Sequence, residues 1–161
     1  MQGQGEVGLE QVRHGIADFW ATGAAVGLPL LYTWLAEVSA HLGRTAEGLQ
    51  ALDKAHTLME QHKERWWEAE IHRLQGILLL RQTSTPPAEV TACLQKALAV
   101  AHRQQAKALE LRAAMSLSRL WQRQGKRAAA YDLLAPVYGW FTEGFDTADL
   151  QEAKTLLAAL A

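Results

Sequence analysis

The sequence predicts an all-α fold of about eight antiparallel helices, on three observations. Ala and Leu dominate the chain, and only four of its 161 residues are proline. Val, Ile and Thr are sparse and never alternate with polar residues over a strand's length, as a half-buried strand would require. The sequence also repeats with a period near 40 residues, which is typical of helical repeat arrays.

The individual helices follow from the residues that interrupt the apolar pattern. Gly43 and Gly125 lie in short breaks, where glycine fits the left-handed residue that ends a helix. The Pro86–Pro87 pair stops one helix and can begin the next, and Asp146 or Thr147 can cap the last helix. The expected helices span residues 5–21, 28–42, 45–61, 65–82, 87–103, 106–124, 127–142 and 147–160.

The internal repeat sets the expected domain organisation. Residues 46–55 match residues 88–97 at an offset of 42, and residues 88–97 match residues 128–137 at an offset of 40. One helix pair cannot bury its apolar stripe alone, so stacked pairs are expected to bury a continuous core in one domain. That domain, 1–161, divides into a half repeat 1–24, repeats 25–63, 64–104 and 105–144, and a closing helix 145–161.

The two-helix unit resembles a tetratricopeptide repeat (TPR), which places small residues where the paired helices cross and glycine in the turn. Such positions hold Ala36, Gly43, Gly48, Ala55, Gly76, Ala97, Ser118, Gly125 and Ala130. The resemblance implies a right-handed superhelix closed by a C-terminal helix. A related helical-repeat variant stays open, because the repeats exceed the roughly 34 residues of a TPR.

A narrower resemblance rests on residues 15–24 (GIADFWATGA), 64–74 (ERWWEAEIHRL), 109–117 and 134–147 (LAPVYGWFTEGFDT). These segments are similar to the C-terminal TPR-like region of large bacterial signalling ATPases. Many of those proteins carry an N-terminal adenylate/guanylate cyclase-type or transcription-regulator domain. The resemblance implies a sensing or partner-binding module, and it carries over no catalytic residue.

The start of the chain is expected to be an open end of the array. Gly3 aligns with the turn glycine Gly43, so the chain is expected to begin inside a repeat. The first helix should then expose an apolar face through Val12, Ile16 and Phe19. A fragment of a longer protein is favoured over a short gene whose open end pairs with another surface.

Composition excludes several classes of function. Sixteen basic and seventeen acidic side chains give a net charge of −1, which argues against a general nucleic-acid or membrane-surface binder. One cysteine excludes an intrachain disulfide framework. No apolar run reaches the roughly 18 residues that span a bilayer, and the N-terminus lacks the regions of a signal peptide. The expected location is the cytoplasm.

Motifs of catalysis are weak throughout. Gly3–Gly8 matches G-x-G-x-x-G, but no strand precedes it, so a glycine-rich repeat turn is expected. The six histidines show no metal-ligand spacing, and Cys93 lies mid-helix in an apolar segment. We therefore expect no catalytic residue, no metal and no cofactor, and the chain is not expected to be an enzyme.

The strongest functional signal is a groove. In TPR-like arrays the first helix of each pair lines the concave face, and the expected partner-binding residues there are Glu37, Arg73, Arg112, Met115 and Arg119. Arg112 and Arg119 are two turns apart and project on one side. Guanidinium groups beside an apolar floor suit an acidic or C-terminal carboxylate ligand. The alternative is a basic face paired within the chain, for example Arg112 with Glu70.

Trp66 and Trp67 are candidate aromatic anchors for a peptide, because Trp dominates interface hot spots. The alternative for both is packing between repeats, and Trp140 is expected to seal the last repeat.

Together these signals predict a non-catalytic protein–protein interaction module, a scaffold or sensor segment of a bacterial regulatory ATPase. Its partner would be a peptide or the parent protein's own ATPase domain, held in the concave groove. One alternative is self-association, as a homodimer, through the open N-terminal helix face. Another is a small-molecule effector site in the groove.

Overall fold

The computed structural model describes residues 2–82 and 84–161, which form eight α-helices and no strand. The helices are α1 (Gln2–Ala21), α2 (Leu28–His41), α3 (Thr45–His62), α4 (Glu68–Leu79), α5 (Pro87–Arg103), α6 (Lys107–Arg123), α7 (Arg127–Gly139) and α8 (Ala148–Leu160). The predicted all-α class is confirmed for this part of the chain. Thr83, in the predicted break before Pro86, lies outside the described residues.

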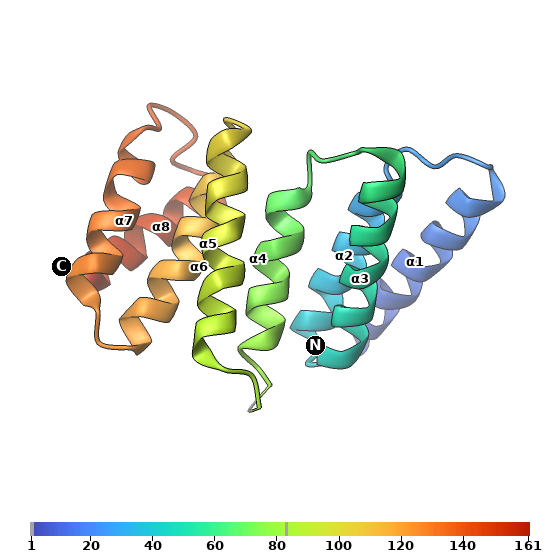
Figure 1. Ribbon diagram of the computed structural model, residues 1–161, viewed down its shortest axis with the longest axis horizontal. Helices are drawn as coiled ribbons and strands as arrows, with labels where there is room; N and C mark the ends of the chain where they lie inside the picture. The colour runs from blue at the N-terminus through green and yellow to red at the C-terminus, as the bar shows by residue number, and fades with distance from the viewer. Residues whose placement is uncertain (1, 83) are drawn as a thin grey trace.

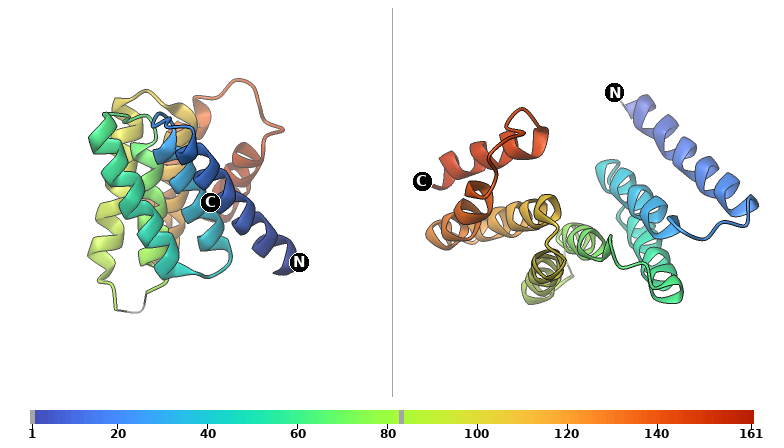
Figure 2. Two further views of the ribbon diagram at one scale, coloured as in Figure 1. Left: turned by 90° about the vertical axis from the view of Figure 1, so that its right-hand side faces the viewer. Right: turned by 90° about the horizontal axis from the view of Figure 1, so that it is seen from above.

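The helices pack as consecutive hairpins, α2 with α3, α4 with α5 and α6 with α7 (Figure 1). The inner helices α2, α4, α6 and α8 each contact the next, so they form a continuous layer. Seen from above, the chain follows an arc with α1 and α8 at its two ends and the outer helices α3, α5 and α7 on its convex side (Figure 2). The inner layer therefore lines the concave face.

Small residues allow the paired helices to approach closely. A Cβ atom built on Gly76 would lie 2.8 Å from Leu94 Cδ2, closer than real side chains come. At the equivalent crossing of the next pair, the Ser118 hydroxyl donates to the carbonyl of Ala130 at 2.9 Å. The crossing of α4 with α5 thus requires glycine.

The 42-residue offset is visible in the side-chain contacts of successive repeats. Glu68 and Glu110 are both buried in the first turn of an inner helix. Each accepts from a basic residue three positions earlier, Arg65 at 3.4 Å and Lys107 at 2.7 Å. Positions 68 and 110 are therefore structurally equivalent.

The N-terminal helix differs from its prediction in two ways. The predicted turn at Gly3–Gly8 is helical, because α1 begins at Gln2. Its apolar stripe is not left open: Ile16 is 6% exposed, and Val12 packs against the core that α1 shares with α2 and α3. Arg13 adds ion pairs to Glu10 and, across to α3, to Glu47. Of the three residues expected on a free face, Val12 and Ile16 therefore pack against the core, and Phe19 is half-buried.

Helix boundaries also differ from prediction at both aromatic pairs, and α4 ends at Leu79 instead of at the predicted residue 82. Helix α4 begins at Glu68, so Trp66 and Trp67 precede it, because α3 ends in a left-handed residue, Lys63 with φ 60°, and a turn follows. Helix α7 ends at Gly139, so Trp140 lies beyond its last turn. Both shifts move an aromatic pair from a helix into a connecting segment.

Among the residues that the structure describes, no helix combines the length and the apolar character that crossing a bilayer requires.

Candidate functional site

The centre of the concave face holds a network of ion pairs between inner helices. Arg73 on α4 donates to both carboxylate oxygens of Glu70, at 2.8 and 2.6 Å. Arg112 on α6 reaches the same Glu70 at 2.9 Å and donates to Glu37 on α2 at 2.8 Å. Three consecutive inner helices are thereby joined through their side chains.

This network is largely removed from water. The side chains of Glu70 and Arg73 are 3% and 9% exposed. Burial on its own lowers the pKa of Arg73, but the hydrogen bonds and charge of Glu70 outweigh it, and the pKa of the guanidinium lies above its ordinary value. Arg73 therefore stays charged in its buried position.

Arg73 and Arg112 already hold carboxylates of their own chain. The predicted groove positions Glu37, Arg73 and Arg112 do share one face, as the helical register requires. These two arginines therefore follow the alternative in which the basic face is paired within the chain, and Arg112 does pair with Glu70. A fifth charge, Asp149 on α8, lies 3.9 Å from Arg112, so the cluster holds two cations and three anions.

The predicted positions on α6 meet α8. Met115 is 3% exposed in the core that α6 shares with α7 and α8, because α8 packs over this part of the inner layer. Arg119 pairs with Glu152 of α8 at 2.9 Å, where both side chains are exposed to solvent. Met115 is thus a core residue, whereas Arg119 stands at the surface.

A different set of guanidinium groups beside an apolar floor lies toward the C-terminal ends of α4 and α6, and Arg119 is the one predicted groove residue that it includes. Here a hollow of about 230 Å³ is lined by Ile77, Leu80, Arg81, Leu94, Ser116, Arg119, Leu120 and Arg123. We call it the basic hollow. Arg81 donates to the carbonyl of Ala40, and Arg123 has no ion-pair partner among the described residues. Three guanidinium groups thus border the hollow, and Glu152 neutralises only one of them.

The tryptophan pair lies at the other end of α4. Trp66 is 59% exposed, whereas Trp67 is partly buried and its indole nitrogen is covered without a hydrogen-bond partner. Neither residue lines the basic hollow. The structure therefore does not bring Trp66 and Trp67 together with the predicted groove arginines.

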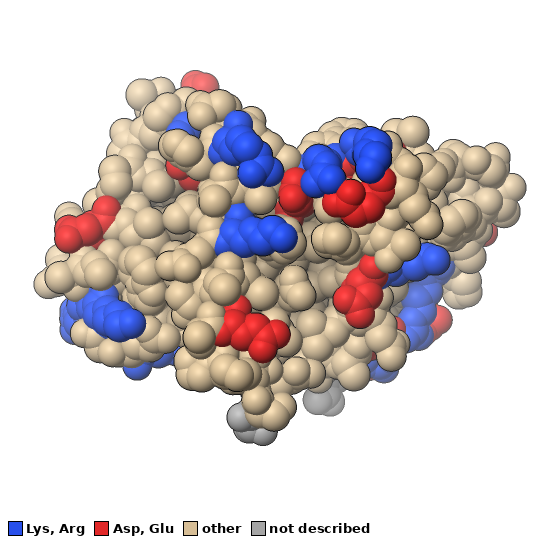
Figure 3. Space-filling model, in the orientation of Figure 1, with Lys and Arg blue, Asp and Glu red and all other residues tan. Residues whose placement is uncertain are grey.

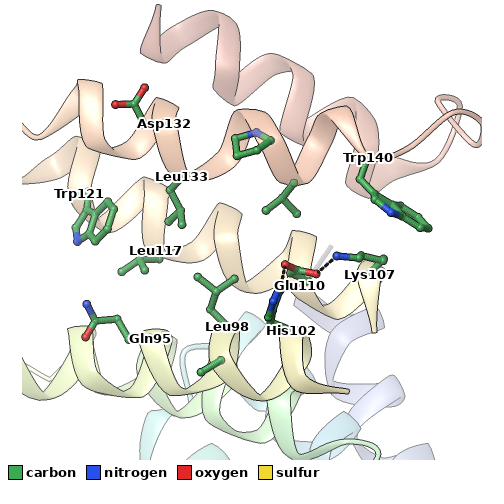
Figure 4. A pocket seen from close by; sticks show the side chains of 13 residues that line it. Gln95, Leu98, His102, Lys107, Glu110, Leu117, Trp121, Asp132, Leu133 and Trp140 are labelled. Carbon is green, nitrogen blue, oxygen red and sulfur yellow. Dashed lines mark hydrogen bonds and ion pairs between the residues drawn. The ribbon is translucent and has the colours of Figure 1, made fainter. Parts of the chain in front are cut away.

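An apolar hollow also lies on the convex side. A trough of about 590 Å³ runs between α5 and α7 over α6, lined chiefly by Leu98, Leu117, Trp121, Leu133, Val137 and Trp140. We call it the outer trough. Figure 4 shows the two tryptophans at opposite ends and the leucines between them. Trp140, predicted to seal the last repeat, is instead 58% exposed at this rim.

At the Trp140 end of the outer trough, a buried carboxylate is hydrogen-bonded by two basic side chains (Figure 4). Glu110 is bound by Lys107 at 2.7 Å and by His102 at 2.9 Å. Burial raises the pKa of Glu110, but these two hydrogen bonds outweigh it, so that its pKa lies below the ordinary value. The ammonium of Lys107 also lies 5.6 Å from the centre of the Trp140 ring.

The side chains that could do chemistry are scattered. Among the described residues no three His, Cys, Asp or Glu side chains are placed to hold a metal ion. Burial raises the pKa of the Cys93 thiol, which disfavours the reactive thiolate. Figure 3 shows basic and acidic side chains mixed over the face that it views, several of them side by side.

Comparisons with protein-family models, with curated proteins and with solved structures gave no significant match. Sequence reasoning missed the outer trough, although aligning the repeats at their 42-residue offset would have exposed it. That alignment pairs His56 with Leu98 and Gln75 with Leu117, two polar positions that turn apolar in the next repeat.

Proposed function

We propose that the chain is a non-catalytic protein–protein interaction module with a TPR-like superhelical arrangement. It binds an acidic segment, or a C-terminal carboxylate, of a partner protein on its concave face. The single observation that carries the proposal is the basic hollow, where an apolar floor of Ile77 and Leu80 is bordered by Arg81, Arg119 and Arg123.

The charge balance favours this hollow over the central network. Arg73 and Arg112 are opposed by three carboxylates, so an anionic ligand gains nothing there. The basic hollow has three guanidinium groups against Glu152, and planar guanidinium groups bind carboxylates through two parallel hydrogen bonds. Leu80, 39% exposed, supplies apolar area for a neighbouring side chain of the ligand.

The resemblance of residues 15–24, 64–74, 109–117 and 134–147 to the C-terminal region of bacterial signalling ATPases supports a regulatory setting for this binding. In that setting the chain is a cytoplasmic scaffold or sensor segment, and its partner is a separate peptide or the ATPase domain of the same protein.

Binding can be tested on an array of peptides that end in free or amidated C-termini. The decisive variant is Arg119→Glu/Arg123→Glu, and Lys54→Glu/Arg103→Glu gives the same charge change at exposed positions of the outer helices α3 and α5. We expect acidic peptides to bind the wild type and the control, and to lose at least ten-fold in affinity for the decisive variant. Equal binding by both variants, at equal helicity, would rule the proposal out.

A further inference from the structure

The outer trough has a counterpart one repeat earlier. Between α3 and α5, over α4, lies a cleft of about 320 Å³, which we call the sister cleft. It is lined by Leu52, Asp53, His56, Ile71, His72, Gln75 and Lys96. The two hollows occupy the same place in successive repeats, with one outer helix on each side and an inner helix as the floor.

The side chains that line the two hollows differ in polarity: those of the sister cleft are mostly polar and those of the outer trough mostly apolar. His56 and Gln75 of the sister cleft correspond to Leu98 and Leu117 of the outer trough at an offset of 42. Lys96 corresponds to Pro136 at the offset of 40 that relates α5 to α7. Because the sister cleft keeps the same helix arrangement with polar side chains, the fold does not require an apolar lining. An apolar lining open to water costs free energy of hydration, and it is typical of ligand sites.

The shape of the outer trough limits its occupant. Its floor runs along α6 from Lys107 to Trp121, fourteen residues later, a distance of about 21 Å. Trp140 and Trp121 stand at its two ends (Figure 4). Its volume of about 590 Å³ lies within the range of small-molecule sites, roughly 300 to 1,000 Å³. A partner helix that continued past either end would meet a tryptophan side chain.

The charges of the trough limit the occupant further. At the Trp140 end, Lys107 and His102 both bind Glu110, so neither side chain is left for an anionic ligand. At the other end Gln95 and Asp132 offer neutral and acidic groups at the rim. The apolar body between them has no charged side chain.

We propose that the outer trough binds a small, elongated, uncharged apolar molecule no longer than about 21 Å. Leu98, Leu117 and Leu133 contact its body, and the indole rings of Trp121 and Trp140 cover its ends. This site lies on the opposite side of α6 from the basic hollow, so it stands whether or not a peptide binds on the concave face.

The test is a titration of the full chain with Nile red, a neutral apolar dye whose emission reports an apolar environment. The decisive variant, Leu98→His/Pro136→Lys, places in the trough the residues that the sister cleft tolerates. Trp140→Ala provides a second variant, at a position that is 58% exposed. Val7→His, which removes exposed apolar surface on α1 and touches neither hollow, is the matched control.

We expect one saturable site per chain, with affinity reduced at least ten-fold in the decisive variant, reduced in Trp140→Ala and unchanged in the control. Decanol should displace the dye at lower concentration than decanoate. Equal dye affinity in the wild type and the decisive variant would overturn the proposal, as would stronger displacement by decanoate. A wild-type dimer that dissociates in the decisive variant would assign the trough to a second copy and would also overturn it.

Discussion

Glu70 and Arg112 hold equivalent positions in successive repeats, 42 residues apart, and their side chains pair with each other at 2.9 Å. The repeated position holds an acidic residue in one repeat and a basic residue in the next, so the two repeats form an ion pair with each other. Arg73 and Glu37 extend this bond to α2. The inner layer is held by complementary charges as well as by its apolar core.

Replacing Glu70 by Gln should strongly destabilise the array. The change leaves the buried guanidinium of Arg73 without its bidentate partner, and breaking such a pair costs about 3–5 kcal/mol. Urea unfolding followed by circular dichroism measures this loss. Glu152→Gln, which breaks the exposed pair with Arg119, should cost less than about 1 kcal/mol. Similar losses for both variants would show that the central network adds no stability.

Replacing Gly76 by Ala should destabilise the α4–α5 crossing, although alanine favours helices. The added Cβ would lie 2.8 Å from Leu94 Cδ2 and 2.9 Å from its Cγ, and Leu94 is buried. Overpacking of this kind costs about 1–3 kcal/mol. Gly15→Ala, where a Cβ meets nothing within 4 Å, should instead add about 0.5–1 kcal/mol. Thermal melts of the two variants should shift in opposite directions.

Acidification should destabilise the protein through His72. Burial, followed by the nearby charge of Lys96, lowers the pKa of His72 below its ordinary value of 6.5, and its Nε2 is covered without a partner. Between the two pKa values the unfolded chain binds more protons than the folded one, so stability falls as the pH drops below about 6.5.

Unfolding curves at about pH 7.5 and pH 5.5 measure this effect, and His72→Phe should reduce the difference between them. The exposed His62→Phe serves as the control and should retain the full difference. A pH dependence that is identical in His72→Phe and in the wild type would contradict this account.

Replacing Gln105 by Gly should stabilise the turn between α5 and α6. Gln105 has φ 55°, a left-handed conformation that costs a residue with a Cβ about 1–2 kcal/mol. Glycine avoids that cost but loses more backbone entropy on folding, so a net gain of about 0.5–1 kcal/mol is expected. Gln124→Gly, at a C-cap with φ −85°, should give no gain in the same melting experiment.

Element types were predictable because glycine and proline punctuate a strong apolar periodicity. Residues 28–42 and 87–103 were predicted within one residue of α2 and α5 for this reason. The start of α4 was not, because Trp66 and Trp67 extend the apolar pattern backwards. These two residues are displaced from the helix by the left-handed conformation of Lys63. Lysine does not favour that conformation, so the sequence did not indicate a helix end there.

Of the candidate site, the shared face of Glu37, Arg73 and Arg112 was predictable from helical register alone. Their pairing was not, because it depends on how far α2, α4 and α6 stand apart, which spacing within a helix does not determine. The burial of Met115 was missed because it depends on where α8 packs. The outer trough was missed because Leu98 and Leu117 are ordinary core residues in a helical pattern.

The outer helices α3, α5 and α7 have no Cα atoms within 8 Å of one another in the described part of the chain, whereas the inner helices touch in series. The array is therefore stiffer along its concave side, where the inner helices touch, than along its convex side, where the outer helices do not. Bending it therefore changes the spacing of α5 and α7 far more than that of α4 and α6. A molecule bound between α5 and α7 would fix the spacing of these two helices. It would thereby set the curvature of the arc and the distance between α1 and α8.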